Sequence, residues 1–448
     1  MPLHIALFTP THDPKFLYET YVSVCKAKTE PFRLTWYIGY NGKAKPEDLP
    51  TVGRHSSGES DNFFEAVHVS LDGVGVIGAL KRALCDRAIE DGADVVVELD
   101  HDDLLSPEAI IEIGSAFERD PDVGFVYSDF TEFVDNGATW SSFFYGSQHG
   151  WFSYPSPQLP HEPRSAGLVS MRAFEPSARS VSEIFFAPNH VRAWRASVYK
   201  AVGGHDVTMD VGDDHDLVVR TYLATKMYRI PKPIYFYRRH PDGGNSFLAK
   251  TEKIATISQN LKNRYLHRLV ERECALKNYA MLDLGGAVYK PNGWLSVDLA
   301  DADINHDLTL GLPDVPDGRP IGAVRASDFL EHLSSLDATR LIQSIYDKLV
   351  PGGWLLTRTP HASGLGADCD PTHVSRWNEV SFLYHTDAAK RQYLTRQLPW
   401  LNCRYQRVRL HVEHYDVSCN DVRIPPIPYV IADLCALKGQ QQPGVVFI

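Results

Sequence analysis

The chain has 448 residues, 44% of them hydrophobic, and a formal net charge of -11; this length predicts at least two globular domains, and the acidic balance gives no global reason for a polyanionic partner such as DNA. The seven cysteines are scattered and never form a CxxC pair, which argues against a disulfide framework or a thiolate zinc site. No segment approaches the ~20 apolar residues of a membrane-spanning helix, so we expect a cytoplasmic protein without a membrane span.

The first half of the chain alternates between predicted strands and helices. Strands are expected at residues 4–10, 33–42, 94–100 and 123–130, and helices at 17–27, 76–92 and 107–120. This alternation is typical of a mostly parallel α/β sheet. From about residue 136 to 180 it gives way to a long segment with the aromatic residues Trp140, Phe143, Phe144, Tyr145, Trp151, Phe152 and Tyr154. This segment is interpreted either as an acceptor-binding surface or as a lid packed on the domain's own core.

Regular structure is expected again at residues 190–204, 213–226 and 231–240, followed by one long helix at about 250–278. Ile254, Ile257, Leu261, Tyr265 and Leu269 recur in this helix at helical spacing, with Lys262, Arg264, Arg268 and Arg272 on other faces. We interpret it as a linker helix whose apolar stripe docks on a neighbouring domain. A second α/β series then follows, with strands at 280–287, 293–300, 321–330 and 352–360 and a helix at 335–349. It predicts a domain boundary near residue 275, and we expect the last 60 residues to extend the second sheet.

The predicted strand "VVVELDHDDLLSP" ends in unusual negative charge: Asp100, His101, Asp102 and Asp103 follow its valines. Ligands of open α/β sheets bind at the carboxyl ends of strands. Carboxylates there repel an anionic ligand unless a hard cation such as Mg²⁺ or Mn²⁺ bridges them to a diphosphate. The alternative is that this turn only caps the next helix, since Ser106-Pro107 has the form of a helix start.

Over about residues 1 to 248 the chain resembles the family 2 glycosyltransferases of the GT-A fold. The matching segments are "IALFTPTHD", "ELDHDDLLSPEAI", "VGFVYSDF", "AWRASVYKAVGGHD", "GDDHDLVVR" and "YRRHPDGGNS". The chain departs from the family pattern at Tyr40, where an acidic residue is common, so the resemblance does not extend to the nucleobase preference.

The resemblance implies a role for each matching residue. Asp102 would bind the metal ion, His240 would complete the metal and diphosphate site, and Asp100 would contact the metal, its waters or the nucleotide. Asp214 would be the general base that deprotonates the acceptor hydroxyl, as sugar transfer with inversion requires. The other expected donor-binding residues are Thr9, Thr11, His101, Asp103 and Arg238.

Over about residues 279 to 386 the chain resembles the class I S-adenosylmethionine-dependent methyltransferases. The resemblance is carried by "LDLGGAVYKPNGWLSVDL", by "EHL" and by a Pro-Gly-Gly turn, and it departs at Ala287, where a glycine is usual. It implies that Asp283, Gly285 and Gly286 face the methionine part of the cofactor, Asp298 its ribose and Asp328 its adenine. A domain kept for packing or acceptor docking is the alternative. His332, Asp370 and His373 are interpreted as polar groups satisfied in a loop, with acid-base catalysis as the alternative.

The expected organisation is therefore a GT-A domain at residues 1–248, a linker helix at 249–278 and a Rossmann-like, methyltransferase-type α/β domain at 279–448. The leading hypothesis is a metal-dependent inverting glycosyltransferase that uses Mn²⁺ or Mg²⁺ and a nucleotide sugar, with UDP as the expected nucleotide. Its acceptor would be a hydroxyl of a glycan or glycoconjugate, and S-adenosylmethionine is the cofactor implied for the second domain. The alternatives are a phage-type glycosyltransferase acting on a hydroxylated DNA base and a non-catalytic nucleotide-sugar binding protein.

Overall fold

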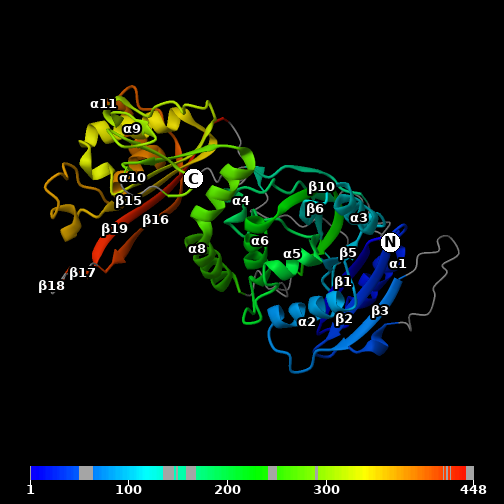
Figure 1. Ribbon diagram of the computed structural model, residues 1–448. Coiled ribbons are helices and arrows are strands. Elements are labelled where there is room, and N and C mark those ends of the chain that lie inside the picture. Colours follow the sequence, from blue (N-terminus) through cyan, green and yellow to red (C-terminus); the bar gives the residue numbers. More distant parts are fainter. Residues whose placement is uncertain are drawn as a thin grey trace. The chain divides into compact units, whose positions relative to one another are not determined.

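The computed structural model describes residues 2–49, 64–134, 146–147, 150–157, 168–240, 250–287, 291–416, 418–419, 422–423 and 425–439. The chain divides into two compact units, Met1–Leu266 and His267–Ile448 (Figure 1). This division falls inside one long helix, α8 (Thr251–Lys277), which occupies the segment where the linker helix was expected. Both units have the α/β architecture that the sequence predicts. Trp140, Phe143, Phe144 and Tyr145 lie outside the described residues.

The first unit is built on one sheet in the strand order β3-β2-β1-β4-β9-β6-β10-β5, and the short strand β8 pairs with both β6 and β7. The strands are β1 (His4–Thr11), β2 (Arg33–Tyr40), β3 (Phe64–Ser70), β4 (Val95–Glu98), β5 (Leu104–Leu105), β6 (Val123–Phe133), β7 (Ser153–Pro155), β8 (Val169–Met171), β9 (Arg192–Arg195) and β10 (Lys226–Arg238). The strand pairs β3–β2, β2–β1 and β1–β4 are parallel, and so is the pair β6–β10. Strand β9 lies antiparallel between β4 and β6. The sequence predicted no such strand, because "RAWR" is directly followed by a helix.

Helices cover both faces of this sheet. They are α1 (Leu17–Lys26), α2 (Ile77–Glu90), α3 (Ala109–Arg119), α4 (Ala178–Val181), α5 (Ala196–Ala201) and α6 (Asp213–Ala224), with a 3-10 turn η1 (Pro46–Asp48). Alternate residues of β1 belong to different cores: Ile5 and Leu7 pack with α1 and α3, whereas Ala6 and Phe8 pack with α2, α5 and α6. This two-sided burial explains the continuous apolar runs of the central strands.

Helix α8 buries the apolar stripe that its sequence predicts. Leu261, Tyr265 and Leu269 are all buried. Lys262, one of the four basic residues predicted on the other faces, is also buried and forms an ion pair with Glu183. It is therefore not available to a nucleic-acid phosphate.

The second unit has a seven-stranded sheet in the order β13-β12-β11-β14-β15-β19-β16. Its strands are β11 (Ala280–Leu284), β12 (Leu295–Asp298), β13 (Ile304–Asn305), β14 (Ile321–Ser327), β15 (Leu349–Pro360), β16 (Tyr405–Tyr415) and β19 (Ile427–Ala436), and a separate pair is formed by β17 (Ser418–Cys419) and β18 (Val422–Arg423). The first five sheet strands are parallel, and β19 is antiparallel to both of its neighbours. Strands β16 and β19 thus extend the second sheet, as expected for the last 60 residues.

The strand order of the second unit reverses between β11 and β14, which makes this the switch point where doubly wound sheets bind ligands. Helices α9 (Ser335–Lys348), α10 (Glu379–Thr386) and α11 (Ala388–Gln397) and the 3-10 turns η4 (Leu308–Leu310), η5 (Leu330–His332) and η6 (Leu365–Ala367) complete the unit. Side chains of α9 and α10 pack with the sheet strands in one hydrophobic core.

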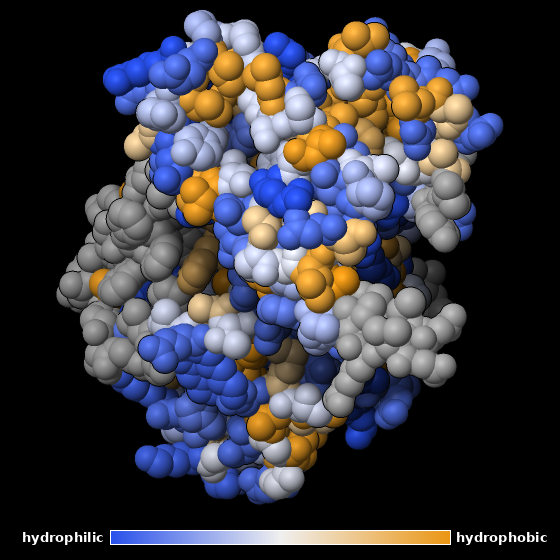
Figure 2. Space-filling model, turned by 90° about the vertical axis from the view of Figure 1, so that its left-hand side faces the viewer, coloured by the Kyte–Doolittle hydropathy of each residue, from blue (hydrophilic) through white to orange (hydrophobic). Residues whose placement is uncertain are grey.

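The described surface is of mixed polarity. On the face shown in Figure 2, described hydrophobic residues form small groups among hydrophilic ones. Within the described ranges, every helix is too short or too polar to cross a membrane.

Candidate active site

The acidic turn after β4, formed by Asp100, His101, Asp102 and Asp103, lies next to His240, which comes much later in the chain. The Asp102 Oδ2 atom lies 2.7 Å from Nε2 of His240, which is 138 residues away in sequence. His240 follows β10, whose end is held next to the turn by the antiparallel pairing of β10 with β5. The structure therefore brings together two of the three residues that the sequence predicted at the metal site.

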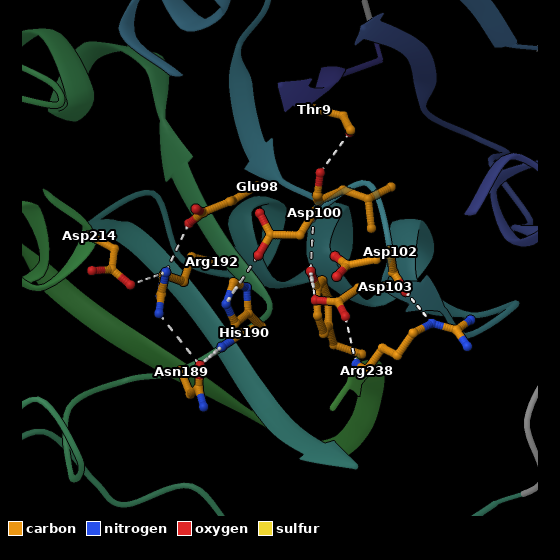
Figure 3. Close-up of polar contacts among 12 residues, drawn as sticks. Thr9, Glu98, Asp100, Asp102, Asp103, Asn189, His190, Arg192, Asp214 and Arg238 are labelled. Atoms are coloured by element: carbon orange, nitrogen blue, oxygen red, sulfur yellow. Dashed lines mark hydrogen bonds and ion pairs between the residues drawn. The ribbon is translucent and has the colours of Figure 1, made fainter. Parts of the chain in front are cut away.

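Asp103 and Arg238 hold this turn in place (Figure 3). The buried Asp103 carboxylate accepts hydrogen bonds from the Tyr235 hydroxyl at 2.8 Å and from the backbone N–H of Arg238 at 2.6 Å. The Arg238 side chain, also buried, donates to the backbone oxygen of Asp102 at 2.9 Å and to Glu19 at 2.6 Å. These polar atoms support the turn, and the donor contacts of Asp103 and Arg238 stay predictions.

Thr9 and Thr11 were predicted to contact the nucleotide, and both are fully buried. The Thr9 hydroxyl donates to the backbone oxygen of Leu99 at 2.6 Å and accepts from Nε1 of Trp36 at 2.9 Å. The Thr11 hydroxyl donates to the backbone oxygen of Asp13 at 3.3 Å. Both hydroxyls thus anchor the chain beneath the site, and the contacts of Thr9 and Thr11 with a nucleotide stay predictions.

Two carboxylates of the turn have opposite electrostatic environments. Desolvation, followed by repulsion from Glu98, raises the pKa of Asp100 to about 7. For Asp102, burial opposes ionisation, but the hydrogen bond from His240 lowers the pKa below its ordinary value. The Asp100 side chain is 32% exposed, and its Oδ2 atom lies 3.9 Å from Nε2 of His190. Asp100 therefore presents an accessible carboxylate beside an ionised one.

His101 lies partly exposed in the same turn. Its ring is edge-on to that of His12, with centroids 5.0 Å apart. Burial lowers its pKa, so the imidazole is neutral at pH 7. Its predicted donor contact stays a prediction.

A buried ion network connects the acidic turn to Asp214. Oε1 of the fully buried Glu98 forms an ion pair with Lys81 Nζ at 2.5 Å, and Oε2 accepts a hydrogen bond from Arg192 Nη1 at 3.1 Å. The same Arg192 nitrogen lies 2.8 Å from Oδ2 of Asp214, and Lys81 lies 3.4 Å from Asp213. Figure 3 shows Arg192 between Glu98 and Asp214, with Asp100 nearby. The network fixes Asp214, the predicted base, relative to the end of β4.

Sequence reasoning did not identify Lys81, Glu98 or Arg192. One signal was present: Glu98 follows three valines in a strand expected to be buried, and a buried carboxylate needs a cation. The sequence did not indicate which cations, because Arg192 reaches Glu98 only through the unforeseen pairing of β4 with β9.

Asp213 and Asp214 begin α6, and their pKa values are shifted in opposite directions. Burial raises the pKa of Asp213 to about 6, in spite of Lys81. Burial also opposes ionisation of Asp214, but Arg192 and then Lys81 outweigh it and lower the pKa to about 2. Asp214 is thus an ionised carboxylate with 23% of its side chain exposed.

Replacing Lys81 with methionine is expected to destabilise the first unit by about 3–5 kcal/mol, because Glu98 and Asp213 would keep buried charge without their shared cation. Thermal unfolding of the full chain measures this as a lowered transition temperature. Lys200→Met changes an exposed lysine on α5 and serves as the control. Equal transition temperatures for the two variants would contradict the importance of the network.

The described aromatic residues of the segment at 136–180 have divided roles. Trp151 is buried and packs against Phe174, with ring centroids 4.3 Å apart. Phe152, in contrast, is 61% exposed. Trp151 therefore belongs to the core, as the lid interpretation predicts, and Phe152 remains a candidate for acceptor contact.

Asp283 and Gly286, two of the predicted cofactor residues of the second unit, lie close to each other. The buried Asp283 forms a two-pronged ion pair with Arg325, at 2.6 and 2.9 Å. A Cβ atom at Gly286 would lie 2.3 Å from Oδ2 of Asp283, so this glycine is required for close packing over the carboxylate. Arg325 neutralises the Asp283 carboxylate, and the contact of Asp283 with a cofactor stays a prediction.

The other three predicted cofactor residues lie at the carboxyl ends of neighbouring strands. Gly285 follows β11 with a φ of +73°, a conformation suited to glycine. Asp298 ends β12, and its Oδ1 atom accepts the N–H of Leu299 at 2.7 Å. Asp328 follows β14 and pairs with Arg358. Their roles toward a cofactor stay predictions.

Neither a family model nor a curated protein sequence matches the chain. Among solved structures, residues 1–349 of S. aureus TarS in complex with UDP-GlcNAc are 10% identical, with 62% of this chain and 72% of that chain covered and a TM-score of 0.39. The mannosyltransferase PcManGT from Pyrobaculum calidifontis, in complex with GDP-Man and Mn2+, is 14% identical, with 60% and 69% covered and a TM-score of 0.37. At identities and TM-scores this low, the function has to be inferred from the site itself.

Proposed function

We propose that the first unit is a metal-dependent glycosyltransferase, which moves a sugar from a nucleotide-sugar donor to a hydroxyl acceptor with inversion. The observation that carries this proposal is the pairing of Asp102 with His240 at 2.7 Å, at the carboxyl end of a central strand. Asp100 adds an accessible carboxylate at the same place. This edge of an open α/β sheet is where ligands bind.

The residues at this edge fit a divalent cation. Asp102 and His240 offer one oxygen and one nitrogen, and Asp100 offers further oxygens; carboxylates suit both Mg²⁺ and Mn²⁺, and the imidazole favours Mn²⁺. A cation bound there would neutralise the charge that develops on a diphosphate leaving group. Asp103 and Arg238 keep the ligand atoms in place through their hydrogen bonds to the turn.

Asp214 is proposed as the general base. The acceptor oxygen attacks the anomeric carbon from the face opposite the diphosphate, and the hydroxyl proton passes to the Asp214 carboxylate. The bond from the anomeric carbon to the diphosphate oxygen breaks, and the diphosphate leaves with the electron pair. A single displacement of this kind inverts the anomeric centre.

Arg192 has two effects on this base. It orients the Asp214 carboxylate through the contact at 2.8 Å, but it also lowers the pKa far below the value of an efficient base at neutral pH. Proton transfer therefore requires the ion pair between Arg192 and Asp214 to loosen when donor and acceptor bind. Arg192 would keep its ion pair with Glu98 during this change.

The acceptor is proposed to be a glycan or glycoconjugate hydroxyl. A DNA acceptor is disfavoured by the net charge of -11 and by the buried, paired state of Lys262, because affinity for nucleic acid depends on cations that neutralise phosphates. A cytoplasmic location is proposed on the sequence evidence alone.

Thermal unfolding with a panel of UDP- and GDP-sugars tests the donor site. One nucleotide class is expected to raise the transition temperature with Mn²⁺ present, and to do so far less with EDTA, because a ligand that binds only the folded state stabilises it. No shift with any donor and Mn²⁺ would contradict the proposal.

For the second unit we propose only where a ligand binds. Its order of parallel strands agrees with a Rossmann-like sheet whose ligand crevice lies at the switch point between β11 and β14. The residues predicted for S-adenosylmethionine fit that cofactor only in part, since Asp283 is neutralised by Arg325. We therefore derive no methyl-transfer step.

A further inference from the structure

Two loops of the second unit bring together a glutamate and two histidines. Glu331 and His332 lie in η5, which follows β14, and His373 lies in the loop after β15. One ligand atom from each residue lies within 4.8 Å of those from the other two. Because β14 and β15 are parallel neighbours, the cluster sits at the carboxyl edge of the sheet, next to the switch point.

Glu331 is a buried carboxylate without a hydrogen-bond partner. Its relative exposure is 2%, and neither oxygen accepts a hydrogen bond from any residue in the described part of the chain. Its Oε1 atom faces Nε2 of His373 at 3.9 Å, which is too long for a hydrogen bond. A buried carboxylate in this state is costly unless a positive charge completes it.

The hydrogen bonds around His332 determine which of its nitrogens is free to bind a metal. The Thr372 hydroxyl donates its single proton to Asp370 Oδ1 at 2.6 Å. Its oxygen must therefore accept from Nδ1 of His332, at 3.0 Å. Nδ1 carries the proton, and Nε2 of His332 carries the lone pair.

The imidazole ring of His373 is oriented in the same manner as that of His332. Nδ1 of His373 lies 3.4 Å from the backbone oxygen of Ala367, which can only accept a hydrogen bond. Nε2 of His373 therefore also carries a lone pair, and it is the atom directed at Glu331. Fixing the tautomer through the other ring nitrogen is the usual arrangement for histidines that bind metals.

Backbone hydrogen bonds lock the two loops to each other. The backbone oxygen of Glu331 accepts the N–H groups of Val374 at 2.9 Å and Ser375 at 3.1 Å, and the Ser375 hydroxyl donates to the backbone oxygen of Leu330 at 3.2 Å. The cluster is thus built on a preorganised support, as a specific site requires.

We propose that Glu331, His332 and His373 bind a divalent transition-metal ion, for which Zn²⁺ is the best match. Two imidazoles and one carboxylate are a donor set that Zn²⁺ accepts, with one coordination position left for water or an oxygen ligand. His332 is exposed, so solvent reaches that position. The site differs from the carboxylate-rich turn of the first unit, and it does not depend on glycosyl transfer.

Calorimetric titration of the metal-free full chain with ZnCl₂ tests the site. The Asp102→Asn variant serves as the parent, so that the first unit's site does not contribute. We expect one high-affinity Zn²⁺ per chain, with the affinity lowered by about 100-fold or more in both Glu331→Gln and His373→Ala, since even the supporting partners of metal ligands are worth 10–100-fold. His414→Ala removes an exposed histidine of β16 outside the cluster and is expected to leave the affinity unchanged.

Co²⁺ absorption in the visible range provides a second readout. Co²⁺ bound to the parent is expected to give bands that Zn²⁺ displaces and that Glu331→Gln lacks. Glu331→Gln preserves the shape of the side chain, and its unfolding temperature without metal shows whether it is folded. Unchanged Zn²⁺ affinity in folded Glu331→Gln, or a parent chain that binds no Zn²⁺, would overturn the proposal.

Discussion

Asp102→Asn is expected to lower the affinity for the nucleotide-sugar donor in the presence of Mn²⁺ by about 100-fold or more. The substitution removes the ionised carboxylate that lies 2.7 Å from His240, and with it the main negative charge available to the cation. Isothermal titration of donor into protein, with Mn²⁺ and again with EDTA, measures the effect. In the variant the two titrations are expected to give similar, weak affinities.

Asp122→Asn provides the matched control for this result. Asp122 is an exposed aspartate of the first unit, outside the acidic turn, and its substitution is expected to preserve the Mn²⁺-dependent affinity. A full Mn²⁺ response in Asp102→Asn would show that the cation does not bind at the turn.

Asp214→Asn is expected to lower kcat by about 10²–10⁴-fold, the range for loss of a general base. Donor affinity with Mn²⁺ is expected to stay within a few-fold of the parent, because Asp214 is linked to the acidic turn only through Arg192 and Glu98. Steady-state nucleotide release gives kcat, and the titration described above gives the affinity.

Asp216→Asn is the control on the same helix. The Asp216 carboxylate pairs with Arg220 at 2.8 Å, outside the ion network, so kcat is expected to be unchanged. Equal losses of kcat and donor affinity in Asp214→Asn would assign Asp214 a purely structural role. Donor binding without turnover in both the parent and the variant would favour the non-catalytic alternative.

Much of the architecture could be predicted from local sequence patterns. The valine run before Glu98 and the helical spacing in α2 and α8 reflect short-range preferences, and the structure has the expected elements there. Pro351-Gly352-Gly353 was predicted as a turn before a strand, but these residues lie inside β15 (Leu349–Pro360). The resemblance to the glycosyltransferase family implied that Asp102 and His240 lie at one site, and the two side chains are 2.7 Å apart.

The ion network could not be predicted, because its members meet only in three dimensions. Lys81 comes from α2, Arg192 from β9 and Asp214 from α6. Strand β9 is four residues long and is inserted antiparallel between β4 and β6. Four residues are too few to show the alternation of a strand, so a short strand directly before a helix cannot be told from the helix by its sequence.

Three of the predicted site residues have partners in the chain that the sequence did not indicate. Thr9, Asp103 and Asp283 were placed correctly at strand ends, but a position in the sequence does not tell whether a polar group faces a ligand or a neighbour. Trp36, Tyr235 and Arg325 respectively engage these three side chains.

Nucleotide release from the donor class selected by the binding panel, measured with Mn²⁺ and with EDTA, tests the central claim most directly. We expect the parent chain to release the nucleotide only with Mn²⁺. We expect no release from Asp102→Asn or from Asp214→Asn. Release that continues unchanged in EDTA, or in both variants, would contradict a metal-dependent glycosyltransferase centred on these residues.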